Sequence, residues 1–197
     1  MAGELTNSNQ IVVPARTRVW LAPVGTIAPA DATVVMPVGW RAVGLTSEDS
    51  LKFNEEPNFE SVKSAQTDFP SRTFQTADAA TVEVDLQQWS GDNFRAVYGG
   101  GEITTITPAG GGATVKHYKF TPPRIGSRTE VAACVEVIDG GKHYRYVLPR
   151  SMQMEGVSKD LNKTKEALLP LRLAVQGGDD VDAWYILTDD PSFAPAP

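Results

Sequence analysis

The clearest structural signal in the chain is the segment "EVAACVEVIDGGKHYRYVLPR", which spans residues 130–150. Two runs rich in valine, isoleucine and tyrosine flank Gly140-Gly141, and paired glycines suit the tight turn of a two-stranded hairpin. We therefore predict an antiparallel hairpin with arms at 130–139 and 142–150.

Further strand candidates recur along the chain. Seventeen glycines and fourteen prolines stand among many valines and threonines, which favours strands joined by turns. We predict a mainly β fold, a β-sandwich or barrel, as a single domain over 17–190 of the 197 residues. Residues 1–16 would form a flexible N-terminal arm, and 191–197 a loosely held C-terminal tail. The other strand candidates are 18–23, 38–46, 81–87, 114–122, 151–159, 165–176 and 182–189.

The segment "TVEVDLQQWSGDNFRAVYGGG", residues 81–101, begins with an alternating run. Alternation of this kind places one set of side chains in the core and the other set outside. The expected core set is Val82, Val84 and Leu86, and the expected outward, mainly acidic set is Glu83, Asp85 and Gln87.

The second half of that segment predicts a short helix. Ser90 is placed to cap its first turn, and Gly99 is placed to end it. Phe94, Val97 and Tyr98 recur at helical spacing, so we expect them to pack this helix against the sheet, because a helix of two turns is not stable alone.

Residues 46–80 are polar but contain spaced phenylalanines, and we interpret them as a long loop or hairpin that projects from the domain toward a partner. Its predicted arms are 51–55 and 59–66, with the turn at 56–58. An ordinary surface meander is the alternative. The residues expected to contact a partner are Phe53, Glu55, Glu56, Asn58, Phe59 and Lys63.

No arrangement of residues along the chain is typical of an active site. Cys134 lies among small apolar residues, and His117 and His143 have no further ligand types at metal-binding spacing. The glycine clusters lack a phosphate-loop pattern, and "GGDDVDAW" lacks calcium-loop spacing. We predict no catalytic residue, no cofactor and no metal. A thiol nucleophile at Cys134 beside His143, or a histidine metal pair, are the enzymatic alternatives.

The net charge is −6. A chain of this charge repels nucleic acid, so a protein that reads DNA sequence is not expected. The chain also lacks a run of about 18 apolar residues, which argues against a membrane span.

Taken in order, two segments resemble the major tail tube protein of long-tailed, siphovirus-type bacteriophages. They are "VGLTSEDSLKFNEEPNFESVKSAQTDFPSRTF" and the 81–101 segment, with "LPLRLAVQ" and "WYILTDDP" similar to the closing strands of that family. The resemblance covers about residues 38–190. The matching residues are Gly44, Leu45, Glu48, Trp89, Arg95, Tyr98 and Gly99.

The resemblance implies a structural virion protein. In that family, six copies form a ring, and stacked rings enclose a channel that delivers double-stranded DNA. The long hairpin loop and the termini bridge adjacent rings, so the resemblance implies that 46–80 is an inter-subunit loop and that its contact candidates lie between rings. It implies partners at the tape measure, tail terminator and tail tip proteins, no membrane binding, and location in the virion tail after synthesis in the cytoplasm of a bacterial host. A non-contractile tail is the default. A capsid decoration or other minor tail protein, and a carbohydrate-binding β-sandwich, are the alternatives.

A channel for DNA should avoid cations on its wall, since each bound phosphate adds binding free energy through counterion release. We therefore expect lumen-facing residues on the outward face of the 81–87 strand and, by the same alternation, on 151–159. Ordinary solvent-facing positions are the alternative. The candidates are Glu83, Asp85, Gln87, Gln153 and Glu155.

Overall fold

The computed structural model describes residues 8–107, 116–177 and 182–195. It is mainly β, with 43% of residues in strands and one α-helix in the described part of the chain. This confirms the predicted fold class. The chain divides into two compact units where a single domain over 17–190 was predicted. The first unit comprises 1–44, 130–151 and 177–197, and the second comprises 45–129 and 152–176.

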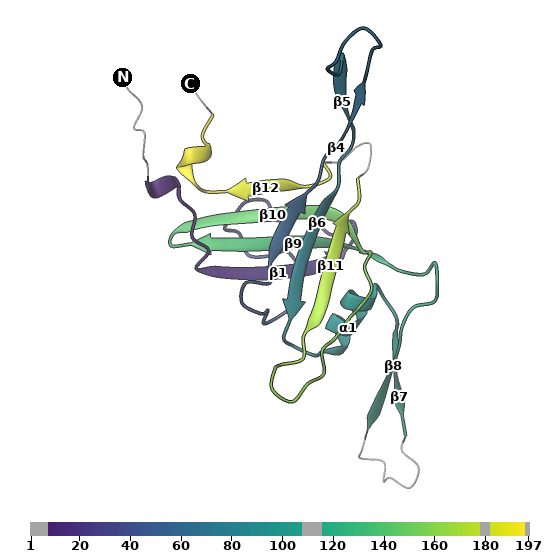
Figure 1. Cartoon of the computed structure of the whole chain (residues 1–197). Helices are drawn as coiled ribbons and strands as arrows, with labels where there is room; N and C mark the ends of the chain where they lie inside the picture. The colour runs from purple at the N-terminus through teal and green to yellow at the C-terminus, as the bar shows by residue number, and fades with distance from the viewer. Residues whose placement is uncertain (1–7, 108–115, 178–181, 196–197) are drawn as a thin grey trace. The chain divides into compact units, whose positions relative to one another are not determined.

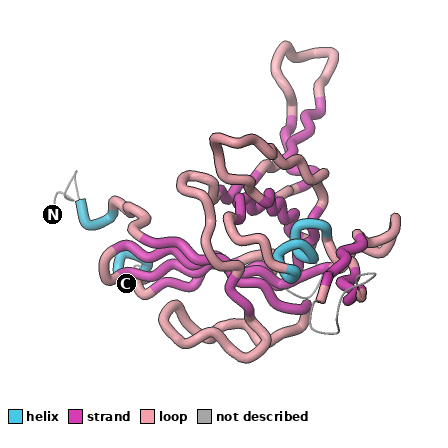
Figure 2. Tube along the Cα trace, turned by 90° about the horizontal axis from the view of Figure 1, so that it is seen from below, coloured by secondary structure: helices cyan, strands magenta, loops and turns pink. Residues whose placement is uncertain are grey.

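The first unit is built on antiparallel strands in the order β2-β1-β9-β10, with β12 also paired to β10. Figure 2 shows the long strands of this unit running side by side. The bounds are β1 Arg16–Pro23, β2 Arg41–Ala42, β9 Glu130–Asp139, β10 Lys142–Gln153 and β12 Tyr185–Thr188, with 3₁₀ turns η1 at Ser8–Gln10 and η2 at Pro191–Phe193. The last two residues of β10 belong to the second unit.

The predicted β9–β10 hairpin is confirmed. β9 ends at Asp139 and β10 begins at Lys142, with Gly140 at a φ of 57° in the turn between them. β1 pairs along the length of β9, from Arg16 opposite Ile138 to its last residue. A left-handed φ at this position carries little steric cost for glycine, which explains the residue choice.

The middle of β9 is covered on both faces, since five successive residues from Ala132 to Glu136 are buried. Part of that cover comes from the segment between β1 and β2. It is held by the Trp40 indole, which donates to Ile27 O at 2.8 Å, and by Arg145, which donates to Val34 O at 2.7 Å. Small and β-branched side chains suit a strand enclosed in this way.

The second unit contains an antiparallel sheet in the order β11-β6-β3, against which α1 packs through β11 (Figure 1). Two further hairpins, β4–β5 and β7–β8, belong to the same unit. The bounds are β3 Lys52–Glu55, β4 Asn58–Val62, β5 Arg72–Ala77, β6 Ala80–Leu86, α1 Gly91–Tyr98, β7 Glu102–Ile106, β8 His117–Thr121 and β11 Leu169–Val175.

The core of the second unit is formed by β6 and β11, in which buried apolar residues alternate with partly exposed ones in matching register. Leu171 lies opposite Val84 in the β11–β6 register, so both strands point their apolar side chains to the same face. The predicted core set is confirmed, because each of its members is fully buried. The side chains of β6 and β11 with 0–1% exposure are Val82, Val84, Leu86, Leu169, Leu171 and Leu173.

The predicted ends of α1 are also confirmed. The Ser90 hydroxyl accepts a hydrogen bond from Asn93 N at 3.1 Å, and Gly99 adopts the left-handed conformation with φ 70°. Val97 is fully buried, as expected. Phe94 and Tyr98 are only half-buried, because they line an aromatic cluster on the helix surface.

The projecting hairpin exists, but its predicted arms are wrong. β4 pairs with β5, and the turn between them lies within 63–71 rather than at the predicted 56–58. β3 instead pairs with β6 in the sheet. Pairing partners this far apart in sequence are set by register and side-chain burial, which a local turn signal does not report.

The residues expected at the turn instead form the base of this hairpin. Glu56 and Ala79 exchange backbone hydrogen bonds of 2.7 and 3.3 Å, so β3 leads into β4, and β5 leads into β6, as one two-stranded ribbon (Figure 1). A register shift at Asn58 and Phe59 marks the bend between the two parts.

Three other strand predictions need correction. β10 extends only to Gln153, so 154–159 is not a strand. The 38–46 candidate contains only the two residues of β2. β7 was not predicted, and it forms a hairpin with β8. Residues 114 and 115 of the predicted strand at 114–122 lie outside the described residues.

Both ends of the described chain are attached to the first unit. In the predicted N-terminal arm, Val13 N donates to the Asp139 carboxylate at 3.1 Å, and Ala15 N donates to Ile138 O at 2.9 Å. In the predicted C-terminal tail, the Phe193 ring packs edge-on against Tyr144 at 6.1 Å between centroids. Residues 1–7 and 196–197 lie outside the described residues.

Candidate functional site

The outward face of β6 is charge-compensated rather than simply acidic. Glu83 and Asp85 lie on the face opposite the core, and both carboxylates face Arg172 of β11. The guanidinium lies 2.8 Å from Asp85 Oδ1 and 3.6 Å from Glu83 Oε2. The cation therefore removes much of the negative charge that the β6 sequence indicates by itself.

Neighbouring polar groups complete this face. Asn54 Nδ2 donates to Glu83 Oε1 at 2.9 Å, and Lys52 stands opposite Glu83 in the β3–β6 register. At the end of the strand, Gln87 Nε2 donates to Glu166 Oε2 at 2.9 Å. These hydrogen bonds and ion pairs give most charged groups of the face a partner of opposite charge or a hydrogen bond, so the face is a polar, charge-compensated surface.

Sequence reasoning missed Arg172. The alternation of leucines in "LPLRLAV" already assigns it to the outward face of its strand. Its partners on β6 depend on a register that no local signal encodes.

Gln153 does not lie on an exposed face, so that part of the wall prediction is wrong. Its side chain is 1% exposed, and its Oε1 accepts a hydrogen bond from Arg172 N at 2.7 Å. Its Nε2 donates to Glu155 O at 3.3 Å. A buried amide is stable only with such partners, and here they come from the loop and from β11. Glu155 itself is exposed.

A hollow of about 490 Å³ lies beside the Asp85–Arg172 pair. It is bounded by β6, β11 and the segment that connects β10 to β11. Acidic side chains outnumber basic ones in its lining. The lining residues are Asp85, Glu155, Gly156, Ser158, Asp160, Asn162, Lys165, Glu166, Leu168, Pro170 and Arg172.

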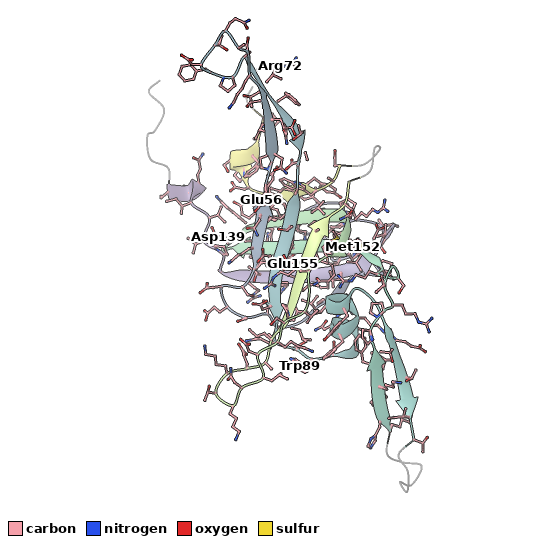
Figure 3. The ribbon with its side chains drawn as sticks, turned by 45° about the vertical axis from the view of Figure 1, so that its right-hand side comes forward. Glu56, Arg72, Trp89, Asp139, Met152 and Glu155 are labelled. Carbon is pink, nitrogen blue, oxygen red and sulfur yellow. The ribbon has the colours of Figure 1, made fainter. Side chains whose placement is uncertain are left out.

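The β4–β5 hairpin exposes all eleven residues of its two strands. Three phenylalanines leave much of their surface in solvent: Phe59 is 60% exposed, Phe69 82% and Phe74 40%. Figure 3 shows Glu56 at the base of this hairpin and Arg72 farther out. Apolar side chains gathered on one extended element are typical of a surface that a partner covers.

The predicted contact residues fall into two groups. Phe53 and Glu55 belong to β3 and therefore to the sheet, with Phe53 half-buried opposite Val82. The others belong to the hairpin or its base: Glu56, Asn58, Phe59 and Lys63.

The residues considered for catalysis have other roles in the structure. Burial raises the pKa of the Cys134 thiol to about 12, so a nucleophilic thiolate does not form near neutral pH. His143 Nδ1 lies 2.9 Å from the carboxylate of Asp189. His117 is exposed on β8. Within 8–107, 116–177 and 182–195, no cluster of three or more acidic, histidine or cysteine side chains could hold a metal. Asp179 and Asp180, weighed as calcium ligands, lie outside the described residues.

A buried ion pair lies in the first unit. Arg145 Nη2 is 2.8 Å from Glu136 Oε1, and the two side chains are only 5% and 4% exposed. Arg145 also donates to the carbonyls of Asp31 and Val34 at 2.9 and 2.7 Å, and Arg18 lies 3.3 Å from the same glutamate. The pair joins β9, β10 and the β1–β2 segment, a role that sequence analysis did not detect.

A second charged cluster anchors the chain near its C-terminus. The Tyr144 hydroxyl donates to Asp190, whose carboxylate also lies 2.9 Å from Lys142 Nζ and accepts from Ser192 N at 2.9 Å. These donors hold the pKa of Asp190 well below its usual value, and the hydrogen bond raises the pKa of Tyr144 to about 12.

Because of this cluster, we expect the thermal stability of the protein to fall at acidic pH through protonation of Asp190. A carboxyl whose pKa is lower in the folded state stabilises the protein above its unfolded pKa, 3.8 here, and that contribution is lost as the pH falls toward the lower folded value. We expect Asp190→Asn to reduce thermal stability at neutral pH and to weaken the decline in melting temperature between roughly pH 4 and pH 2. Thermal melts across this range measure the effect. An Asp68→Asn control on the hairpin turn should reproduce the wild-type profile, and an unchanged profile in Asp190→Asn would contradict the assignment.

The fold and these surfaces define a class of protein: a mainly β protein with an extended polar hairpin that exposes three phenylalanines. The family comparison specifies the class further. The family model for phage tail tube proteins matches residues 4–197, nearly the whole chain, and the chain belongs to that family. No curated protein matches it.

Membership of this family assigns the protein to the tail of the virion and to assembly of a tube with other tail proteins. Among the described residues, no helix has the length and apolar character required to cross a membrane.

Proposed function

We propose that this chain is the major subunit of the tail tube of a siphovirus-type bacteriophage. Six copies form a ring, and the rings stack into a hollow, non-contractile tube through which double-stranded DNA is delivered. The proposal rests on membership of the tail tube family and on the surfaces described above.

The observation that carries the proposal is the β4–β5 hairpin. Its strands are exposed along their length, and Phe59, Phe69 and Phe74 leave 40–82% of their surface in solvent. Covering that surface contributes the corresponding part of the about 1.5–3 kcal/mol that a full burial of such a side chain supplies. The hairpin therefore contacts a subunit of the adjacent ring, and this contact determines how rings stack.

The outward face of β3, β6 and β11 supplies the channel wall in this proposal. Arg172 is neutralised by Glu83 and Asp85, so the face has no uncompensated cluster of cations. A wall without free cations gains little from counterion release and so does not retain DNA. Gln87 and Glu155 extend this wall, and Gln153 supports it from the interior.

The protein's other proposed properties follow from this role. The tube assembles around the tape measure protein and joins the terminator and tip proteins at its ends. The subunit is made in the cytoplasm of the bacterial host, catalyses no reaction, needs no cofactor and does not bind membranes.

Electron microscopy of the purified chain tests the proposal. We expect negative-stain images of concentrated protein to contain tubes or six-fold rings with a central channel. Isolated monomers or trimers that never assemble, together with binding to phage capsids, would indicate a decoration protein instead. Retention on a glycan array without assembly would indicate a carbohydrate-binding module.

A further inference from the structure

Lys159 places its ammonium group among three aromatic rings of the second unit. Its Nζ lies 5.4 Å from the ring centroid of Trp89, 5.1 Å from that of Phe94 and 5.3 Å from that of Tyr98. It also donates a hydrogen bond to the Tyr98 hydroxyl at 3.0 Å. The Trp89 and Phe94 rings are within the distance at which a cation is attracted to the face of an aromatic ring, and Tyr98 contacts the ammonium through its hydroxyl.

The aromatic cluster is formed by residues close together in sequence, and Phe120 of β8 packs against two of them. Phe94 and Tyr98 are one turn apart on α1, and their rings are nearly parallel, with centroids 6.1 Å apart and planes at 13°. Trp89 stands edge-on to Phe94 at 5.3 Å and 72°. Phe120 of β8 packs against both helix residues, at 5.6 and 5.3 Å, which restricts their movement.

The orientation of the indole is also restrained. Trp89 Nε1 donates to Ala167 O at 2.7 Å. Because this bond fixes the nitrogen end of the indole, the tryptophan is part of a preformed cluster rather than a freely rotating surface side chain. Its 46% exposure nevertheless leaves it accessible to solvent.

From this geometry we infer that Trp89, Phe94 and Tyr98 form an aromatic cage for an alkylammonium ion, and that Lys159 is its resident ligand. The faces of aromatic rings carry negative potential, and several such faces around one cation are the basis of alkylammonium recognition. The Tyr98 hydroxyl adds one acceptor, which suits a lysine ammonium with its N–H donors. This site is independent of the proposed ring assembly.

Occupancy of the cage clamps the connection from β10 to β11. Residues 154–168 contain no strand or helix, and this connection is attached at two places. Lys159 holds the first part in the cage, and Trp89 and Gln87 bind the second part through Ala167 and Glu166. Other residues of this connection, among them Ser158, Asp160 and Glu166, line the hollow beside the Asp85–Arg172 pair, so the cage keeps that side of the hollow in position.

Hydrogen exchange in the full-length protein tests the clamp. We expect Lys159→Met, which keeps the side-chain length and removes the charge, to raise amide exchange rates in 154–168 by about tenfold, as loss of a cation–aromatic contact of this kind implies. Amides of β6 and β11 should exchange at wild-type rates, which would show that the fold is intact. Lys159→Arg is the matched control, because it keeps a cation and should stay within about threefold of wild type.

A second measurement tests the cage without relying on the loop. In Lys159→Gly the cage lacks its ligand, and we expect tetramethylammonium to bind with a dissociation constant in the millimolar range, shifting the indole N–H resonance of Trp89 in nuclear magnetic resonance spectra. The wild-type protein should not respond, because its own lysine occupies the site. tert-Butanol, of similar size but neutral, should bind at least about tenfold more weakly.

Two results would overturn the inference. One is loop exchange in Lys159→Met within twofold of wild type. The other is equal binding of the alcohol and the ammonium ion to Lys159→Gly, which would mark an apolar hollow without preference for a cation.

Discussion

Replacing Arg145 with methionine is expected to lower the free energy of unfolding by about 3–5 kcal/mol. The change removes one partner of the buried pair and leaves the Glu136 carboxylate, 4% exposed, without its main counter-charge. It also removes the donors that satisfy the carbonyls of Asp31 and Val34. Arg18 compensates only in part, because its side chain is 46% exposed and makes a single contact with the glutamate at 3.3 Å.

Urea denaturation of Arg145→Met, of a control variant and of the wild type measures this loss of unfolding free energy. Arg150→Met is the matched control, because Arg150 also pairs with a glutamate, at 2.7 Å from Glu130, but on the protein surface. An exposed pair of this kind contributes about 0–1 kcal/mol. Equal losses in the two variants would contradict the structural role assigned to the buried pair.

Removing the aromatic side chains of the hairpin is expected to abolish tube assembly while the subunit remains folded. In the triple variant with Phe59, Phe69 and Phe74 replaced by serine, each ring loses the part of the about 1.5–3 kcal/mol of a full burial that corresponds to its 40–82% exposure. The combined loss weakens the contact between rings by at least about a hundredfold. The melting temperature should change little, because these rings are 40–82% exposed in the single chain.

Sedimentation and negative-stain imaging at matched concentration measure this effect. The corresponding triple leucine variant is the control, since it keeps apolar side chains at all three positions and should retain assembly in large part. If the wild type forms tubes and the serine variant does so equally well, the hairpin does not stack the rings. If the wild type itself never assembles, the tail tube proposal fails first.

Local signals predicted several elements correctly. The Gly140-Gly141 turn, the Ser90 cap and the Gly99 helix end depend on backbone geometry within a few residues, and all three are present. The β6 core set was also predictable, because an alternating strand with one apolar face has only one favourable way to be buried.

The wrong predictions concern segments whose conformation depends on the strand or residue they pair with. The segment around 56–58 has the composition of a turn, yet Glu56 continues the ribbon by pairing with Ala79. The apparent alternation of 151–159 ends at Gln153, whose amide is buried by partners from elsewhere in the chain. In both cases, long-range hydrogen bonding outweighs local preference.

The candidate site also combines features that were predictable from one strand with features that depend on contacts between distant segments. Glu83 and Asp85 could be assigned to an outward face from their own strand, but the cation between them could not. Lys159 is 61 residues from Tyr98, and no pattern in the sequence connects them.

The sequence by itself determined the β9–β10 hairpin, where the single described helix starts and ends, and which side chains of β6 enter the core, because those outcomes depend on backbone and burial preferences of neighbouring residues. Only the tertiary structure decided the pairing of β4 with β5, the neutralising position of Arg172 and the closure of the aromatic cage around Lys159. These features depend on strand register and on contacts between distant segments, which become defined only when the chain has folded.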